Sequence, residues 1–201
     1  GLGKVEINVV EANETFQVGS FEVHPIHVSH SVPESVSLLI RTRYGNVLHS
    51  GDWNLDPSPT VGSPSDADAF SAAGREGILA YIGDSTNAEV DGFSGSESDV
   101  AIGLAEEFKD CKGKIVVTTF SSNIGRVYSI AKAAQACDRQ VAVIGRSLHN
   151  MIGCAKECGY LHDVPGFLDE GDIGLIPDDK LVVIATGSQG EYRAALARIS
   201  R

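Results

Sequence analysis

LHSGDWNLD, residues 48–56, is the stretch on which the interpretation of this chain turns. It begins as an apolar strand, places the carboxylate of Asp52 where that strand ends, and continues into polar residues and a proline. In α/β proteins, an acidic side chain at the carboxyl edge of a sheet often binds a metal ion or a substrate. An aspartate after a strand can equally cap a turn, so the stretch alone leaves both interpretations open.

The composition is that of an ordinary soluble globular chain. Of its 201 residues, 42% are hydrophobic and 21% are charged, which predicts packed cores rather than disorder. The sequence has neither an apolar run of 18 residues nor a signal-peptide pattern, so we expect a cytoplasmic protein that does not enter a membrane. A net charge of −11 disfavours a broad basic surface for nucleic acid but permits a small phosphate site. The four cysteines lack CxxC spacing, so we expect reduced thiols.

The first half of the sequence is predicted to form strands. One short helix is expected over residues 66–73, within a segment rich in Pro, Ser, Gly and Asp. Alternating or continuous apolar runs predict five strands, with the third and fourth forming a hairpin: residues 4–10, 15–23, 37–42, 46–50 and 78–82.

Three polar side chains, His30, Asp52 and Asp84, stand where predicted strands stop. Imidazole and carboxylate groups at converging strand ends can hold Zn²⁺ or a pair of divalent ions. Three ligands are too few for a two-metal site, so further ligands would have to come from elsewhere. His24 and His27 are expected to be structural, because a strand of period two turns His27 away from the face of His30.

The second half of the sequence alternates strands with helices. The S-x-x-D pattern at residues 96–99 predicts the start of a helix that runs to about residue 109. The alternation predicts a parallel sheet with helices packed on it, a Rossmann-like domain that begins near residue 93. Three strand and helix pairs follow: 115–119 with 126–137, 141–144 with 148–159, and 181–185 with 191–199.

Each of these three strands is followed by a short polar or glycine-bearing loop. In a parallel sheet the three loops emerge at one edge, where helix N-termini present backbone N–H groups that suit phosphate. Ser121 and Asn123 lie in the first loop and Arg146 in the second. Serine and asparagine are also common helix caps, so capping and ligand binding stay alternatives. No loop matches the glycine-rich patterns of nucleotide-binding proteins, so a nucleotide cofactor is not indicated.

Five strings of the sequence stand out when taken in order: HSVPES at 30–35, SGDWNLD at 50–56, GDSTNAE at 83–89, GRS at 145–147 and TGSQGE at 186–191. They resemble those of ribonuclease J, the branch of the metallo-β-lactamase superfamily that carries a β-CASP domain. The resemblance covers the chain from about residue 5 to its end. It implies an α/β fold in which residues 1–92 are part of a metallo-β-lactamase αββα sandwich and residues 93–201 part of a Rossmann-like β-CASP domain with a parallel sheet.

The resemblance also implies roles for individual side chains. His30 would ligate one zinc ion and Asp52 would bridge two. Asp84 would be the catalytic acidic residue beside the metal centre, because it matches the first β-CASP motif. Ser121 and Asn123 fall where the family holds a phosphate of RNA.

The implied activity of the parent protein is zinc-dependent hydrolysis of RNA phosphodiester bonds, internally and from the 5′ end. Two metal ions would activate a water molecule, and manganese is a possible substitute for zinc. Arg146 or Arg126 would contact the RNA backbone, unless a carboxylate partner engages them.

Departures from the family pattern limit what this chain is expected to do by itself. The HxHxDH motif, which supplies most zinc ligands in the family, does not occur in the sequence, and Glu191-Tyr192-Arg193 replaces the usual Glu-Pro-Met. We therefore interpret the chain as a central fragment with an incomplete zinc site and no activity of its own. Its uncovered sheet surface predicts pairing with another copy or with the parent chain. The alternative function is a non-catalytic Rossmann-like module that binds nucleotide, RNA or a partner protein.

Overall fold

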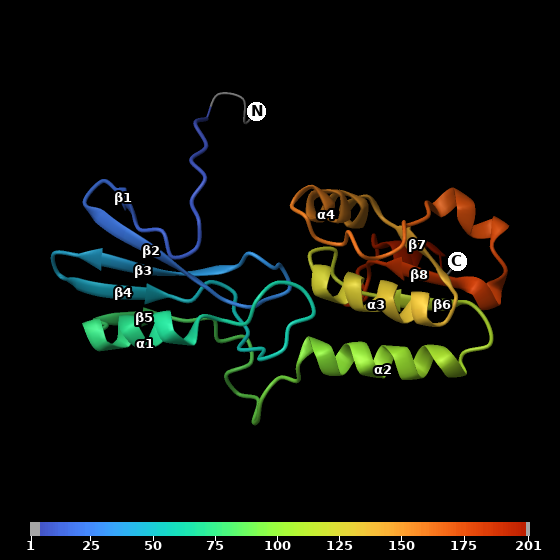
Figure 1. The fold of residues 1–201 in the computed structure, drawn as a ribbon, viewed down its shortest axis with the longest axis horizontal. Helices are drawn as coiled ribbons and strands as arrows, with labels where there is room; N and C mark the ends of the chain where they lie inside the picture. Colours follow the sequence, from blue (N-terminus) through green and yellow to red (C-terminus); the bar gives the residue numbers. More distant parts are fainter. Residues whose placement is uncertain (1–4, 200–201) are drawn as a thin grey trace. The chain divides into compact units, whose positions relative to one another are not determined.

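The computed structural model describes residues 5–199, which form two compact units (Figure 1). The chain passes from one unit to the other several times. The sequence predicts a metallo-β-lactamase domain over residues 1–92 and a β-CASP domain over residues 93–201. These boundaries stay a prediction. The first unit holds residues up to 30, 34–55 and 64–93, and the second holds residues 31–33, 56–63 and 94 onward.

The first unit contains a five-stranded sheet with strands in chain order. Its first four strands are antiparallel neighbours, whereas the fifth pairs parallel to the fourth. The parallel pair brings the carboxyl ends of two strands to the same edge. The strands are β1 (Phe16–Val18), β2 (Phe21–His27), β3 (Val36–Thr42), β4 (Gly45–His49) and β5 (Ala80–Ile82).

Helix α1 (Ala67–Glu76) covers part of this sheet. The helix begins after Asp66, whose side-chain Oδ1 accepts a hydrogen bond from the backbone N–H of Ala69 at 2.9 Å, as expected of an N-cap. The buried contact joins Ile26 and Leu39 of the sheet to Ala73 of the helix. The predicted helix is thus confirmed, with one more turn at its end.

Two of the strand predictions in the first unit are wrong in detail. Residues 5–10 form no strand, and Val9 is 85% exposed, because alternation alone does not supply a partner strand. The predicted strand 15–23 is interrupted by a two-residue turn, across which Val18 pairs with Phe21. The apolar residues change from even to odd positions between Val18 and Phe21, and that change of phase marks the turn.

The second unit contains a three-stranded sheet in which every neighbouring pair is parallel, with the order β6-β8-β7. This confirms the predicted α/β class and parallel sheet. The strands are β6 (Ile115–Thr118), β7 (Gln140–Ile144) and β8 (Leu181–Ala185). The helices are α2 (Glu97–Asp110), α3 (Ile124–Ala136), α4 (Arg146–Glu157) and α5 (Ala195–Ile199), with short 3₁₀ helices η2 (Glu170–Leu175) and η3 (Asp178–Lys180).

Both faces of strands β7 and β8 are buried. Val141 and Val143 of β7 pack into the core with α2, α3 and α4, whereas Ala142 and Ile144 pack on the opposite side with α5. A strand that is apolar on both faces is typical of a parallel sheet covered by helices. None of the helices within residues 5–199 is long and apolar enough to span a membrane.

Asp56, the last residue of the stretch LHSGDWNLD, is hydrogen-bonded to the start of α2. Its carboxylate accepts hydrogen bonds from Ser96 Oγ at 2.6 Å and from the backbone N–H groups of Glu97 and Ser58, both at 2.8 Å. Burial alone would raise the pKa of the Asp56 carboxyl, but these three hydrogen bonds lower it below its ordinary value. Asp56 is therefore a charged, buried structural residue.

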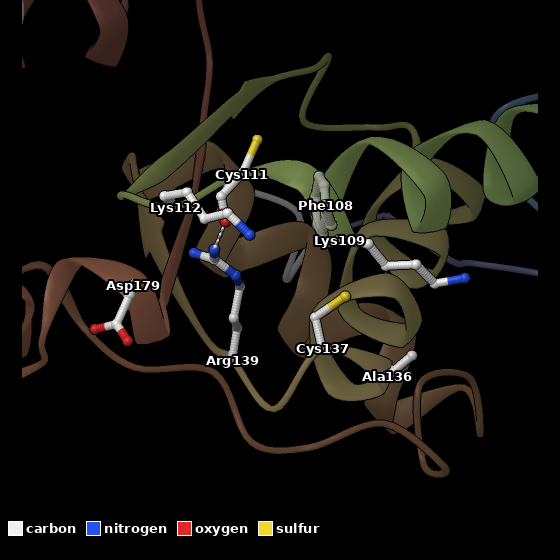
Figure 2. Close-up of a pocket in the computed structure, with 8 residues that line it drawn as sticks. All are labelled: Phe108, Lys109, Cys111, Lys112, Ala136, Cys137, Arg139 and Asp179. Atoms are coloured by element: carbon white, nitrogen blue, oxygen red, sulfur yellow. Dashed lines mark hydrogen bonds between the residues drawn. The ribbon is translucent and has the colours of Figure 1, made fainter.

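Arg139 performs a similar function at the other end of α2. Its side chain is buried, and its Nη2 and Nη1 donate to the backbone carbonyls of Cys111 at 2.6 Å and Gly113 at 2.8 Å (Figure 2). The guanidinium thus satisfies the carbonyl of the C-cap residue of α2 and one carbonyl of the loop that follows it. Arg139 lines a cavity of about 410 Å³, and Asp179 also belongs to its lining.

Candidate functional site

Hydrogen bonds between the ends of β4 and β5 bring Asp52 and Asp84 to one edge of the first sheet. The backbone N–H of Ser50 donates to the carbonyl of Ile82 at 2.9 Å, and Ser50 Oγ accepts from the backbone N–H of Asp84 at 2.8 Å. Ser50 is buried, whereas Asp52 and Asp84 are exposed. A buried serine thus positions two loops whose carboxylates face solvent.

The loop that carries His30 joins the same edge. Ser29 forms an isolated antiparallel bridge with Asn54, in which the Asn54 N–H donates to the Ser29 carbonyl at 2.8 Å, and Ser29 Oγ donates to the Asn54 carbonyl. His30 therefore lies next to the loop of Asp52. The structure thus brings the three segments that carry the predicted site residues to one sheet edge, although these segments are separated in sequence.

The carboxylate of Asp84 is held in its charged form. The side-chain hydroxyl of Thr86 donates to Asp84 Oδ1 at 2.6 Å and the Thr86 backbone N–H at 3.0 Å. These two bonds are the main causes that lower the pKa of Asp84; desolvation opposes them, and smaller contributions from His30 and the backbone amide of Trp53 lower the pKa further. Asp84 is thus an acceptor or base near neutral pH, not a proton donor.

Gly51 permits the turn that leads to Asp52. Its φ is +63°, and a Cβ added there would lie 3.1 Å from the backbone carbonyl oxygen of Val36. The left-handed conformation and the close approach both favour glycine. The preceding residue is also fixed, because Ser37 Oγ donates to the Ser50 carbonyl at 2.6 Å.

The residues described in the structure do not complete a metal site by themselves. Within residues 5–199 there is no group of three or more His, Cys, Asp or Glu side chains that could hold a metal ion. His24 is engaged elsewhere, since its Nδ1 lies 2.9 Å from Thr15 Oγ1. The metal-ligand roles of His30 and Asp52 stay predictions, and the ligands present do not suffice for zinc.

In the loop after β6, Asn123 caps a helix and Arg126 pairs with a carboxylate. Asn123 Oδ1 accepts from the Arg126 backbone N–H at 2.9 Å, so this side chain caps α3. The Arg126 guanidinium forms a forked ion pair with Glu97, with Nε–Oε1 at 2.7 Å and Nη2–Oε2 at 3.1 Å. Arg126 is therefore engaged by a carboxylate. Ser121 lies half-buried in the turn before the cap, and its phosphate role stays a prediction.

Arg146 differs from Arg126 in its surroundings. It is the first residue of α4, it is exposed, and no ion pair to it occurs in the described part of the chain. Arg146 lines a cavity of about 520 Å³ together with Arg193 and Arg198, two arginines that were not predicted as site residues. The replacement of the family's usual methionine by Arg193 was the signal that could have found them.

Comparison with known proteins identifies the class of the second unit first. Residues 112–201 match the family model described as "Ribonuclease J, beta-CASP domain". This match agrees with the parallel sheet and its helices, so the region is a β-CASP domain.

Similarity to curated proteins named ribonuclease J then extends over nearly the whole chain. Ribonuclease J of Sinorhizobium meliloti is 44% identical over 98% of this chain and 35% of that protein. The ribonucleases J of Mycolicibacterium smegmatis and Helicobacter pylori are 40% and 35% identical, each over 96% of this chain and over 35% and 28% of their own lengths. The chain thus spans about a third of the length of these relatives.

A solved structure shows a similar fold at low sequence identity. It is the crystal structure of a protein of unknown function from Enterococcus faecalis V583, with a TM-score of 0.61 and 15% identity over 92% of this chain and 46% of that chain. At this identity the similarity concerns the fold alone.

Proposed function

We propose that this chain forms part of a metal-dependent ribonuclease that hydrolyses phosphodiester bonds of RNA, by internal cleavage and from the 5′ end. The observation that carries the proposal is that the loops of His30, Asp52 and Asp84 meet at one sheet edge, in a chain similar to ribonuclease J. The curated relatives are named for ribonuclease activity, which supports RNA as the substrate class.

In this proposal each site residue has a distinct task. His30 and Asp52 contribute part of a ligand set for two zinc ions, with manganese as an alternative, and residues outside these 201 contribute the rest. Asp84, whose carboxylate Thr86 holds in the charged form, is the catalytic acidic residue beside these metal ions. Ser121 and Asn123 contact a phosphate of RNA. The side-chain oxygen of Asn123 caps α3, so its contact is made by the side-chain NH₂ group.

We propose no activity for the 201-residue chain alone, and a cytoplasmic location. We also propose association between copies, because apolar side chains of the first sheet are uncovered: Tyr81 and Ile82 are each 54% exposed and Phe21 is 48% exposed. Light scattering over a hundredfold concentration range tests the association. A mass of one chain at every concentration would contradict it.

The ribonuclease proposal is tested with the complete protein encoded by the reading frame that contains these residues. A 5′-labelled RNA is incubated with Zn²⁺ or Mn²⁺, and the products are analysed for 5′-phosphate ends. His30→Ala and Asp52→Ala are expected to lower the rate by about 100-fold or more, since outer-shell changes alone cost 10- to 100-fold. The matched control is His162→Ala, because His162 is exposed and its Nδ1 contacts only the Gly159 carbonyl.

Two results would reject the proposal. The first is a complete protein that cleaves no RNA with either metal, and the second is undiminished cleavage by His30→Ala. Tight RNA binding without cleavage would favour the non-catalytic module instead.

A further inference from the structure

Two exposed cysteines, Cys154 and Cys158, lie one turn apart at the end of α4 (Figure 1). The backbone N–H of Cys158 donates to the Cys154 carbonyl at 2.9 Å, so the two residues stand at positions i and i+4 on one face of the helix. Free cysteine is among the residue types that are most often fully buried. Neither core packing nor a disulfide therefore accounts for this pair, and its thiols are open to a ligand.

Hydrogen bonds at the end of α4 hold the two thiols in a fixed arrangement. Cys158 is the C-cap residue, and Gly159 follows it with φ +86°. The Tyr160 N–H donates to the Ala155 carbonyl at 2.8 Å. The Gly159 N–H donates to the Lys156 carbonyl at 3.1 Å. These two bonds make a Schellman motif, so both thiols are carried by one ordered helical turn.

A third sulfur atom lies on the same side of α4. Met151, the single methionine of the chain, precedes Cys154 by three residues and Cys158 by seven. Residues at positions i, i+3 and i+7 form one stripe along a helix. Met151 is half-buried beside the core, whereas both cysteines are exposed. The stripe thus presents one thioether and two thiols on adjacent turns.

The spacing of the two thiols favours a bridging ion over a disulfide. Cβ atoms one helical turn apart are about 5–6 Å from each other, whereas a disulfide requires about 3.5–4.5 Å. A metal ion bound to both sulfur atoms separates them by up to about 4.6 Å, twice a metal–sulfur bond of about 2.3 Å. The intact helix therefore suits a pair of thiolates that share a metal ion and does not suit a direct S–S bond.

The available donors select a soft cation. Thiolate and thioether sulfur favour Cu⁺, which also accepts linear and trigonal coordination. A structural zinc site requires four protein ligands, and within residues 5–199 there is no group of three or more His, Cys, Asp or Glu side chains that could hold a metal ion. The sulfur stripe therefore fits Cu⁺ better than Zn²⁺.

The charges around the stripe are compatible with a cation. The C-terminal end of α4 carries a partial negative charge. Lys156 is two residues from each cysteine and so does not face either of them. Its ammonium group lies instead over the ring of Phe167, at 5.2 Å from the ring centroid.

The other two cysteines of the chain have different surroundings. Cys111 and Cys137 are the C-cap residues of different helices, α2 and α3, and line the cavity of about 410 Å³ shown in Figure 2. Lys109, Lys112 and Arg139 also line that cavity, and their positive charges oppose the binding of a cation. Cys111 and Cys137 therefore serve as matched controls for the pair on α4.

We propose that Cys154, Cys158 and Met151 form a binding site for one Cu⁺ ion. The two thiolates are the principal ligands, and the thioether is the third. Each thiol loses its proton when the metal binds, so one Cu⁺ releases two protons. The inference does not rest on the proposed ribonuclease function, because it uses none of the residues assigned to RNA or to zinc.

The test measures competition for Cu⁺ between the 201-residue chain and the coloured chelator bicinchoninate, without oxygen and with ascorbate as reductant. We expect one Cu⁺ per chain. The Cys154→Ser/Cys158→Ser double variant should bind Cu⁺ roughly 100-fold more weakly or worse, and Met151→Leu about 10-fold more weakly, since even outer-shell partners of a metal contribute 10- to 100-fold. Leucine keeps the packing of Met151 because it conserves the side-chain volume.

The matched control is the Cys111→Ser/Cys137→Ser double variant, which should bind Cu⁺ as the wild type does. Far-ultraviolet circular dichroism equal to that of the wild type shows that each variant is folded.

A second measurement needs no variant. Iodoacetamide labelling of the wild-type chain, followed by mass spectrometry of its peptides, identifies which of the four cysteines Cu⁺ protects. Protection should fall on Cys154 and Cys158 and leave Cys111 and Cys137 reactive, and Zn²⁺ at the same concentration should protect neither pair.

Three results would overturn the proposal. The first is protection by Cu⁺ that falls on Cys111 and Cys137 instead. The second is a Cys154→Ser/Cys158→Ser variant that competes for Cu⁺ as well as the wild type does. The third is protection of Cys154 and Cys158 by Zn²⁺ that equals their protection by Cu⁺.

Discussion

Replacing Asp56 with asparagine tests whether a buried carboxylate holds the start of α2. Asparagine keeps one oxygen but places an NH₂ group where Oδ2 now accepts from the Glu97 N–H at 2.8 Å. A hydrogen bond to a charged group contributes about 1.5–3 kcal/mol, and a buried donor left without a partner costs a similar amount. We expect Asp56→Asn to lower the free energy of unfolding of the second unit by about 2–3 kcal/mol.

The chain offers a way to observe the two units separately. Its single tryptophan, Trp53, lies in the first unit, whereas α2, α3, α4 and α5 belong to the second. Urea unfolding followed by circular dichroism therefore reports mainly the second unit, and tryptophan fluorescence reports the first. With an m-value of about 2 kcal/mol/M, the dichroism midpoint should fall by about 1 M or more while the fluorescence midpoint stays in place.

The matched control is Asp52→Asn, which changes an exposed carboxylate four residues earlier and should move neither midpoint when a chelator is present. The difference between Asp56→Asn and wild type should depend on pH. Because the pKa of Asp56 is lower in the folded state, its contribution is present above the unfolded pKa, about 3.9, and is lost as the pH falls through the lower folded value. Equal midpoints for Asp56→Asn and Asp52→Asn at pH 7 would refute the reasoning.

Two further stability changes follow from the fold. Gly51→Ala should lower the fluorescence midpoint by an amount equivalent to about 1–3 kcal/mol, because φ is +63° and the new Cβ would lie 3.1 Å from the Val36 carbonyl; an unchanged midpoint would show that the turn is not strained. Arg139→Met should lower the dichroism midpoint by an equivalent of about 2–3 kcal/mol, because it leaves the carbonyls of Cys111 and Gly113 without their donor. A stability equal to that of the wild type would show that water replaces the guanidinium at no cost.

The local elements of this protein could be predicted well because their signals lie within a few residues of one another. The S-x-x-D pattern predicted the start of α2, and the structure contains the reciprocal capping box of Ser96 and Asp99. The hairpin of β3 and β4 followed from two apolar runs and a short turn, and its register ends with Thr42 opposite Gly45. By contrast, alternation misled at residues 5–10, since a strand also needs a partner.

The sequence named candidate site residues but did not indicate how they are arranged. Each of His30, Asp52 and Asp84 ends a strand in the sequence pattern, yet only the parallel pairing of β4 with β5 and the bridge from Ser29 bring them to one edge. The sequence also left open whether a carboxylate would pair with Arg126 or Arg146. In the structure Glu97 pairs with Arg126, whereas Arg146 has no ion pair within residues 5–199.

The stretch LHSGDWNLD contains features set by the local sequence and features set by the tertiary structure. Its sequence alone determined a strand that ends at a glycine turn, with an aspartate at the carboxyl end, since these depend on local backbone preferences. Only the tertiary structure decided that Asp52 faces solvent beside Asp84, whereas Asp56, four residues on, is buried against Ser96, 40 residues away. Two identical side chains acquired different roles because hydrogen-bond partners distant in sequence are chosen by packing, which no local pattern encodes.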